Sequence, residues 1–187
     1  MRFPRSLGSA GAVLAAAVLA GPLAGQADER DRTSELRTWG QAEFDWRIRP
    51  LEGEPMTLAE FRGKTLFINL WATWCTPCVR ELASIERLRD RLDDTAVVFL
   101  AIAPQGEGPV ERFVRAHGYD LPFYLEIQRT PPVFGARGLP TTWVVDPRGR
   151  IVLLRHGEAV WDTPEIEAFL RRIDGAPDGL RRPTLRP

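Results

Sequence analysis

Thiol and imidazole side chains are scarce in this chain of 187 residues, which holds two cysteines and two histidines. Thiol chemistry is therefore confined to Cys75 and Cys78. A structural zinc site needs about four ligands, and neither His117 nor His156 has the spacing of a zinc motif to this pair. A purely structural disulfide would close a very short loop and constrain the unfolded chain little. Redox exchange is favoured over both, and a Cu(I) ion held by two thiolates and one histidine stays open as an alternative.

The chain also lacks an excess of either charge, because 25 basic residues balance 25 acidic ones. No basic run or stripe is present, so the electrostatic footprint of a nucleic-acid-binding protein is missing and we expect no nucleic-acid partner. Internal repeats are absent as well. With 44% hydrophobic residues the sequence can form one proper core, which predicts a single domain with extensions.

The first 27 residues have the pattern of an export signal. Arg2 and Arg5 precede an apolar stretch over 10–20, and Gly25-Gln26-Ala27 places small residues where a signal peptidase cleaves. We therefore expect the globular part to lie in an oxidising compartment such as the bacterial periplasm.

The signal also sets the expected domain boundaries. An uncleaved membrane anchor over 7–24 is the alternative to cleavage, although this stretch is at the lower limit for spanning and contains glycine and proline. After the signal we expect a flexible linker over 28–39, a folded domain over 40–174 and a loose tail over 175–187.

The cysteine pair stands between a predicted strand and a predicted helix. Residues 65–71 are apolar and nearly continuous, as expected of a central strand covered on both faces. The helix over 76–91 has an apolar face, with Thr76 as the expected N-cap and Pro77 in the first turn. Cys75 then faces unpaired N–H groups and the positive end of the macrodipole, which stabilise a reactive thiolate. The pattern predicts a thiol–disulfide exchange protein.

The remaining elements alternate between strands and helices. Strands are predicted over 44–48, 95–103, 123–127, 141–145 and 150–155, and helices over 110–117 and 163–173, the last with Thr163 as N-cap. Shorter helical turns are expected over 57–61, with Thr57 and Glu60 as a capping box, and over 132–136. This order predicts an α/β, thioredoxin-like fold with a central mixed sheet, helices on both faces and an N-terminal β extension.

Trp74-Cys75-Thr76-Pro77-Cys78, preceded by Asn69-Leu70-Trp71-Ala72-Thr73, resembles the active site of TlpA- and ResA-type thioredoxin-like proteins. The resemblance runs from about residue 51 to about residue 173 and includes Gly138-Leu139-Pro140-Thr141-Thr142, which is similar to the G-x-P-T-T segment of this family. Members of the family are exported thiol–disulfide reductases, and many serve cytochrome c maturation.

The resemblance implies roles for residues around the pair. Cys75 and Cys78 are expected to form the redox-active disulfide. Pro140 corresponds to a proline that is cis in the family, where it places the backbone of Leu139 beside the reactive sulfur, ready to pair with a substrate chain. The predicted substrate-binding residues are Trp74, Thr76, Pro77, Leu139 and Pro140.

Glu81, three positions after Cys78, matches an acid that lies near the active site of ResA-type proteins. Ordinary thioredoxins instead have a buried aspartate six residues before the first cysteine, a position held here by Asn69, which cannot titrate. We predict that Glu81 is partly buried, has a raised pKa and tunes proton transfer to Cys78. The alternative is a solvent-facing glutamate paired with Arg80 or Arg87.

The sequence thus predicts a protein-disulfide reductase that acts in cell redox homeostasis, in which Cys75 attacks and Cys78 resolves. The expected substrates are exported proteins of cytochrome c maturation or copper-site assembly. The resemblance implies a membrane electron donor of the DsbD or CcdA type, and no metal or organic cofactor. A disulfide oxidase or isomerase of the same fold and a Cu(I)-binding metallochaperone remain the alternatives.

Overall fold

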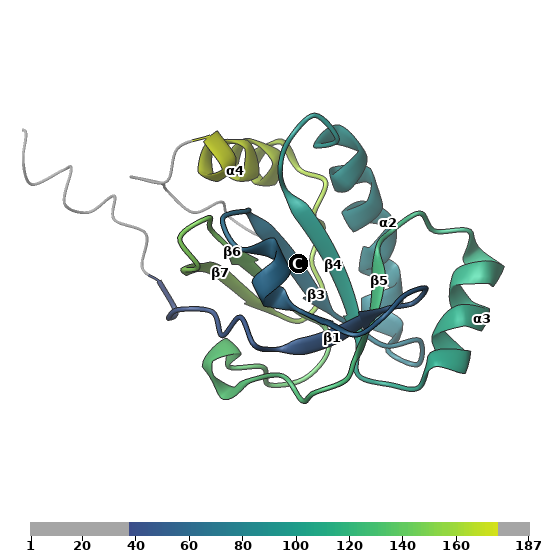
Figure 1. The fold of residues 1–187 in the computed structure, drawn as a ribbon. Helices are drawn as coiled ribbons and strands as arrows, with labels where there is room; N and C mark the ends of the chain where they lie inside the picture. Colours follow the sequence, from purple (N-terminus) through teal and green to yellow (C-terminus); the bar gives the residue numbers. More distant parts are fainter. Residues whose placement is uncertain (1–37, 176–187) are drawn as a thin grey trace, which may run out of the picture.

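The computed structural model describes residues 38–175, which fold around a seven-stranded sheet (Figure 1). The predicted export signal and nearly all of the predicted linker and tail lie outside the described residues. The strands are β1 (Arg47–Pro50), β2 (Met56–Thr57), β3 (Leu66–Leu70), β4 (Val98–Ala103), β5 (Phe123–Glu126), β6 (Thr141–Val145) and β7 (Ile151–His156). The helices are α2 (Thr76–Arg91), α3 (Glu107–His117) and α4 (Pro164–Gly175), with 3₁₀ helices η2 (Leu58–Phe61) and η3 (Pro132–Phe134).

The sheet has the order β2-β1-β5-β4-β3-β6-β7 and is mixed, as predicted. Its three central strands β5, β4 and β3 are parallel, whereas β6 pairs antiparallel with β3 and β1 pairs antiparallel with β5. Strands β1 and β2 form the expected N-terminal β extension. Helix α2 connects β3 to β4, and α3 connects β4 to β5, so both connections step in the same direction across the sheet. Because such connections are right-handed, the two helices lie on the same face of the sheet.

Alternate residues of the central strands enter two separate cores, one on each face of the sheet. Phe67 of β3 packs with residues of α2, α3 and α4. Ile68 packs on the other face, with Leu58 of η2, Phe134 of η3 and Trp46 of the N-terminal segment. Both faces are therefore covered by helices, but the α-helices gather on one face and the 3₁₀ helices on the other.

Aromatic side chains hold the segment between β5 and β6 against the second core. Trp46, Phe134 and Trp143 contact one another, with ring centroids 5.0 to 6.2 Å apart. The indole N–H of Trp143 donates to the carbonyl of Phe134 at 2.6 Å, and that of Trp46 donates to the carbonyl of Gln128 at 2.9 Å. These contacts fix the path of the chain toward β6.

Some local predictions differ from the structure, and three of them have a clear physical reason. The burial of residues 44–48 alternates as predicted, but the strand that forms is β1, because pairing with β5 starts only at Ile48. The Thr57 side chain makes no capping hydrogen bond, because the turn that follows is a 3₁₀ helix. Helix α3 begins at Glu107 instead of residue 110, since Pro109 lies in the first turn, where its missing N–H needs no partner.

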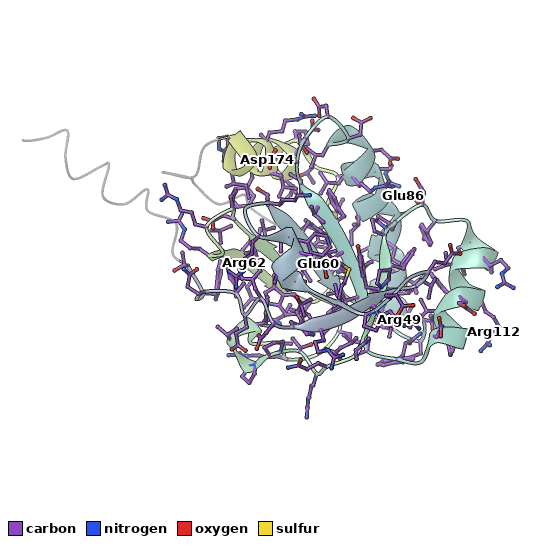
Figure 2. All side chains as sticks on the ribbon, in the orientation of Figure 1. Arg49, Glu60, Arg62, Glu86, Arg112 and Asp174 are labelled. Carbon is purple, nitrogen blue, oxygen red and sulfur yellow. A yellow bond between two sulfur atoms is a disulfide. The ribbon has the colours of Figure 1, made fainter. Side chains whose placement is uncertain are left out.

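The charged side chains of Glu86 on α2 and Arg112 on α3 lie at the outer surface, as Figure 2 shows. No helix within residues 38–175 is long and apolar enough to cross a membrane.

Candidate active site

Cys75 and Cys78 form a disulfide at the start of α2. The chain reaches the pair directly from the carboxyl end of β3, where the N–H of Trp71 still bonds to Ile102 of β4 and the N–H of Cys75 closes a turn onto Ala72. Cys75 is the N-cap of α2, and its Sγ accepts from the N–H of Cys78 at 3.3 Å. The prediction of Thr76 as N-cap is therefore wrong by one residue, because the sulfur occupies the place of the capping oxygen.

The two sulfurs differ in their access to solvent. Cys75 is 6% exposed and Cys78 is fully buried, so an incoming substrate meets Cys75 first. Trp74 beside it is 72% exposed, an unusual degree for a tryptophan. Thr76 is exposed and Pro77 is half-buried, so all three predicted docking residues of this stretch reach the surface.

The Leu139–Pro140 peptide bond is cis, as the resemblance implied. Thr141, the next residue, begins β6 opposite Leu70, which ends β3. The proline and the disulfide therefore lie at the same end of the sheet, where β3 ends and β6 begins. The carbonyl of Pro140 is occupied by the N–H of Gly157, and Leu139 packs against both cores.

Glu81 is buried, with only 1% of its surface exposed. Its Oε1 accepts from Asn69 Nδ2 at 2.7 Å, and its Oε2 accepts from the N–H of Ala159 and from the indole N–H of Trp161, both at 3.1 Å. Burial raises the pKa of Glu81 to about 7, although the three hydrogen bonds oppose this change and the negative charge of Glu158 adds to it. Both the predicted burial and the predicted direction of the pKa shift agree with the structure.

The alternative of a solvent-facing Glu81 is wrong, because its side chain is 1% exposed, and its two candidate partners are engaged elsewhere. Arg80 binds Glu158 through two nitrogens, and Arg87 binds Asp162 at 2.7 Å. Glu81 points instead from the same side of α2 as Cys78, about one helical turn away.

Residues 158–162, which we call the strap, were not predicted to be part of the site. The strap follows β7 and lies along α2. It supplies two of the three donors to Glu81, and the N–H of its Trp161 also donates to Ser84 Oγ at 3.1 Å. Ser84 in turn donates to the carbonyl of Glu81 at 2.8 Å. The strap residues lie 77 or more positions after the residues of α2 that they contact, so no local sequence pattern could identify them.

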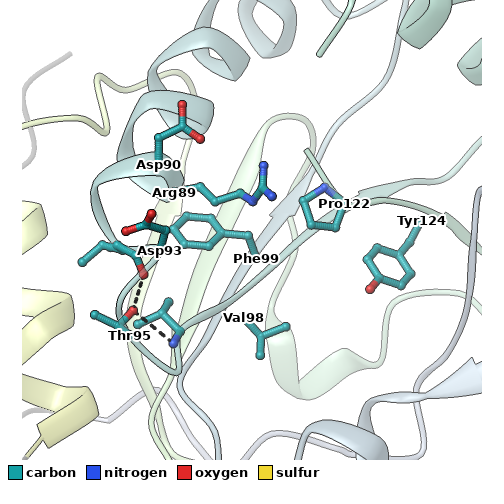
Figure 3. A pocket seen from close by; sticks show the side chains of 10 residues that line it. Arg89, Asp90, Asp93, Thr95, Val98, Phe99, Pro122 and Tyr124 are labelled. Carbon is teal, nitrogen blue, oxygen red and sulfur yellow. Dashed lines mark hydrogen bonds between the residues drawn. The ribbon is translucent and has the colours of Figure 1, made fainter. Parts of the chain in front are cut away.

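One cavity lies apart from the cluster around Cys75, Cys78 and Glu81. This cavity, of about 580 Å³, opens at the opposite end of the sheet, between the end of α2 and the start of β4 (Figure 3). Arg89, Asp93, Phe99 and Tyr124 are among its lining residues, and none of the predicted site residues reaches it. Over residues 38–175, no group of three or more His, Cys, Asp or Glu side chains could hold a metal ion.

Comparisons with known proteins agree with this geometry. The model of the AhpC/TSA family matches residues 40–154. The thiol-disulfide oxidoreductase ResA of Halalkalibacterium halodurans is 33% identical over 120 residues, which cover 63% of this chain and 68% of the relative. A solved structure from Bacteroides vulgatus, described as a thiol-disulfide oxidoreductase, superposes with a TM-score of 0.63 at 25% identity, covering 74% of this chain and 97% of its own.

A second solved structure, described as a thiol:disulfide interchange protein DsbE from Chlorobium tepidum, has a TM-score of 0.58 at 18% identity and shares the fold. It covers 71% of this chain and 94% of its own. The family match spans more than half of the chain and includes the disulfide, Glu81 and the cis proline. The chain therefore belongs to the AhpC/TSA family of thioredoxin-like proteins, as a thiol-disulfide oxidoreductase of the ResA type.

Proposed function

We propose that this protein reduces disulfide bonds in other exported proteins, with Cys75 as the nucleophile. The observation that carries the proposal is the position of Cys75 at the N-cap of α2, where its sulfur already accepts the N–H of Cys78. In the reduced protein this N–H and the helix macrodipole would stabilise a Cys75 thiolate. The buried Cys78 is suited to the second step, which needs no access from solvent.

The exchange has two steps. The Cys75 thiolate attacks one sulfur of the substrate disulfide, forms a mixed disulfide and releases one substrate thiolate, which takes a proton. Cys78 then loses its proton and attacks the Cys75 sulfur, which releases the second substrate thiolate. The substrate gains two electrons and two protons, and the protein is left with the Cys75–Cys78 disulfide.

Glu81 is the group that we propose for accepting the proton of Cys78. A general base works best when its pKa lies near the working pH, and burial raises the pKa of Glu81 to about 7. It lies on the helix that carries Cys78, about one turn away.

We propose further that Trp74, Thr76 and Pro77 contact the substrate around Cys75, and that the backbone of Leu139 pairs with the substrate chain next to Pro140. Trp74 supports this role because a tryptophan side chain exposed to 72% offers apolar docking area beside the sulfur. The position of Pro140 at the same end of the sheet is consistent with it.

The proposed location is the periplasm, after export by the segment 1–27, whether cleaved or kept as an anchor. In that oxidising compartment a dithiol must be maintained by a donor, and we propose a membrane thiol protein of the DsbD or CcdA type. Apocytochrome c and copper-site assembly proteins are the candidate substrates. The thiol-disulfide oxidoreductase names of the relatives support the reaction class.

The deciding experiment is the equilibrium reduction potential of the Cys75–Cys78 pair, measured against glutathione and dithiothreitol. We expect a value near that of thioredoxin, about −250 mV or lower, which suits a reductase. A value approaching that of DsbA, about −120 mV, would make the protein an oxidant and reverse the direction of exchange. Stoichiometric Cu(I) binding that survives a competing chelator would favour the metallochaperone alternative.

A further inference from the structure

The two polar atoms of the Asn69 side-chain amide differ in their hydrogen bonding. Its side chain is 1% exposed and lies on β3, on the face that carries α2. The Nδ2 group uses both of its protons, one for Glu81 Oε1 at 2.7 Å and one for Thr142 Oγ1 at 2.8 Å. Among residues 38–175, the buried Oδ1 atom has no hydrogen-bond partner. An unpaired buried acceptor is costly and calls for an explanation.

The groups around Glu81 suit only its ionised form. Asn69 Nδ2, the N–H of Ala159 and the indole N–H of Trp161 can donate but cannot accept. When Glu81 takes up a proton, its new O–H group faces donors on both oxygens. None of these three groups could accept that proton.

We propose that the Asn69 side-chain amide rotates by half a turn when Glu81 gains its proton, with Thr142 as the partner that fits both orientations. The two ends of an amide have nearly the same shape, so the rotation exchanges Oδ1 with Nδ2 without a change of volume, and its cost is that the Nδ2 protons move to the place now held by the unpaired Oδ1. Oδ1 then accepts from the O–H of Glu81 and from the hydroxyl of Thr142. A hydroxyl can both accept and donate, which is why Thr142 serves either state.

This rotation gives Asn69 and Thr142 the role of positioning residues for the proton step, and that consequence rests on the proposed function of Glu81. A carboxyl group that exchanges a proton with Cys78 needs hydrogen-bond partners both as the carboxylate and as the acid. Without them, the unpaired state is disfavoured and proton transfer slows. Asn69 supplies a donor to the carboxylate and an acceptor to the acid. It does so without a charge of its own.

Several charged or titratable groups surround this cluster and belong in its test. They are Cys78 and Arg80 of α2, Glu158 of the strap and Arg155, which lies opposite Thr142 on β7, whereas α4 presents apolar residues such as Ile166 and Phe169. In the oxidised protein Cys78 does not titrate, because it is in the disulfide. His156 contacts Thr141, whose side chain points to the opposite face of β6 from Thr142.

The test uses nuclear magnetic resonance on the oxidised protein. Asn69 is the single asparagine of the sequence, so labelling with ¹⁵N-asparagine isolates its two side-chain amide protons. These protons are followed from pH about 5 to about 9, together with the ¹³C carboxyl resonance of Glu81. We expect both amide protons to move upfield as pH falls, with the same midpoint as the Glu81 carboxyl. Amide resonances that stay fixed while Glu81 titrates would overturn the rotation.

Variants separate the parts of the inference. Glu81→Gln is expected to make the Asn69 resonances independent of pH, whereas Glu86→Gln on the same helix and His156→Gln on β7 should leave the titration unchanged. In Thr142→Val the amide proton that bonds Thr142 in the wild type should change its chemical shift less between the two states, because it has lost that partner, and in Thr142→Ser both protons should change as in the wild type. Changes of wild-type size for both protons in Thr142→Val would remove Thr142 from the switch. The reduction potential is independent of this readout, so an oxidising value would reject the proposed direction of exchange and leave the rotation standing.

Discussion

Glu81 should make the stability of the oxidised protein fall as pH rises toward neutrality. Burial raises its pKa from an ordinary value of 4.5 to about 7. Between these two pH values the folded state holds a proton that the unfolded state has lost. Linkage then requires that the stabilising contribution is fully present below the unfolded pKa and is lost as pH rises through the folded pKa.

The size of this effect follows from the shift. One pKa unit corresponds to 1.36 kcal/mol, so the shift of Glu81 corresponds to about 3 kcal/mol of unfolding free energy. The figure is appropriate because the side chain is 1% exposed and is not screened by solvent. Glu81→Gln removes the titration. It also places a donor among the donors of Asn69 and Trp161, which adds a loss that is independent of pH.

The assay is urea unfolding of the disulfide-intact protein at several pH values, followed by tryptophan fluorescence. The unfolding free energy of the wild type minus that of Glu81→Gln should fall by about 3 kcal/mol between pH about 4.5 and about 8. Glu86→Gln makes the same chemical change at a partly exposed position of α2 and should show no comparable slope. A constant difference for Glu81→Gln would refute the assignment, because the folded protein would then take up no proton there.

Three further substitutions test separate contacts. Cys78→Ser should accumulate a mixed disulfide between Cys75 and substrate, visible by mass spectrometry, because the resolving thiol is missing. Trp161→Phe keeps the aromatic bulk but removes one donor to the Glu81 carboxylate, so the midpoint of the Glu81 ¹³C titration should rise. Arg80→Ala should leave the midpoint of urea unfolding nearly unchanged, because the ion pair that it breaks with Glu158 is exposed.

The parts of the fold that sequence patterns predicted well are those decided by local burial. Strand β6 has the predicted bounds, and β3 differs by one residue at each end, since near-continuous apolar residues mark strands covered on both faces. The start of β1 was not predictable, because alternation of burial begins at Phe44 while the ladder to β5 begins at Ile48. The division of α-helices and 3₁₀ helices between the two faces depends on crossover direction, which only the strand order reveals.

The candidate site, like the fold, could be predicted only in part from the sequence. Cys78 and Glu81 lie about one turn apart near the start of α2, so spacing alone predicted that they share a side of the helix. The donors that surround the carboxylate come from β3 and from the strap, which is 77 or more positions further along the chain. Helical periodicity cannot report such partners. For this reason the sequence left a solvent-facing Glu81 open as an alternative.

The origin of these donors has a consequence for how the redox chemistry can be adjusted. The pKa of Glu81 reflects burial opposed by hydrogen bonds from Trp161, Asn69 and Ala159. Two of these three donors belong to the strap, which Ser84 fastens to α2. A substitution in the strap can therefore change the proton affinity next to Cys78 without altering any residue between Trp74 and Cys78. In the proposed mechanism, substrate contact and proton affinity are thus controlled by different segments, so each can vary while the other is kept.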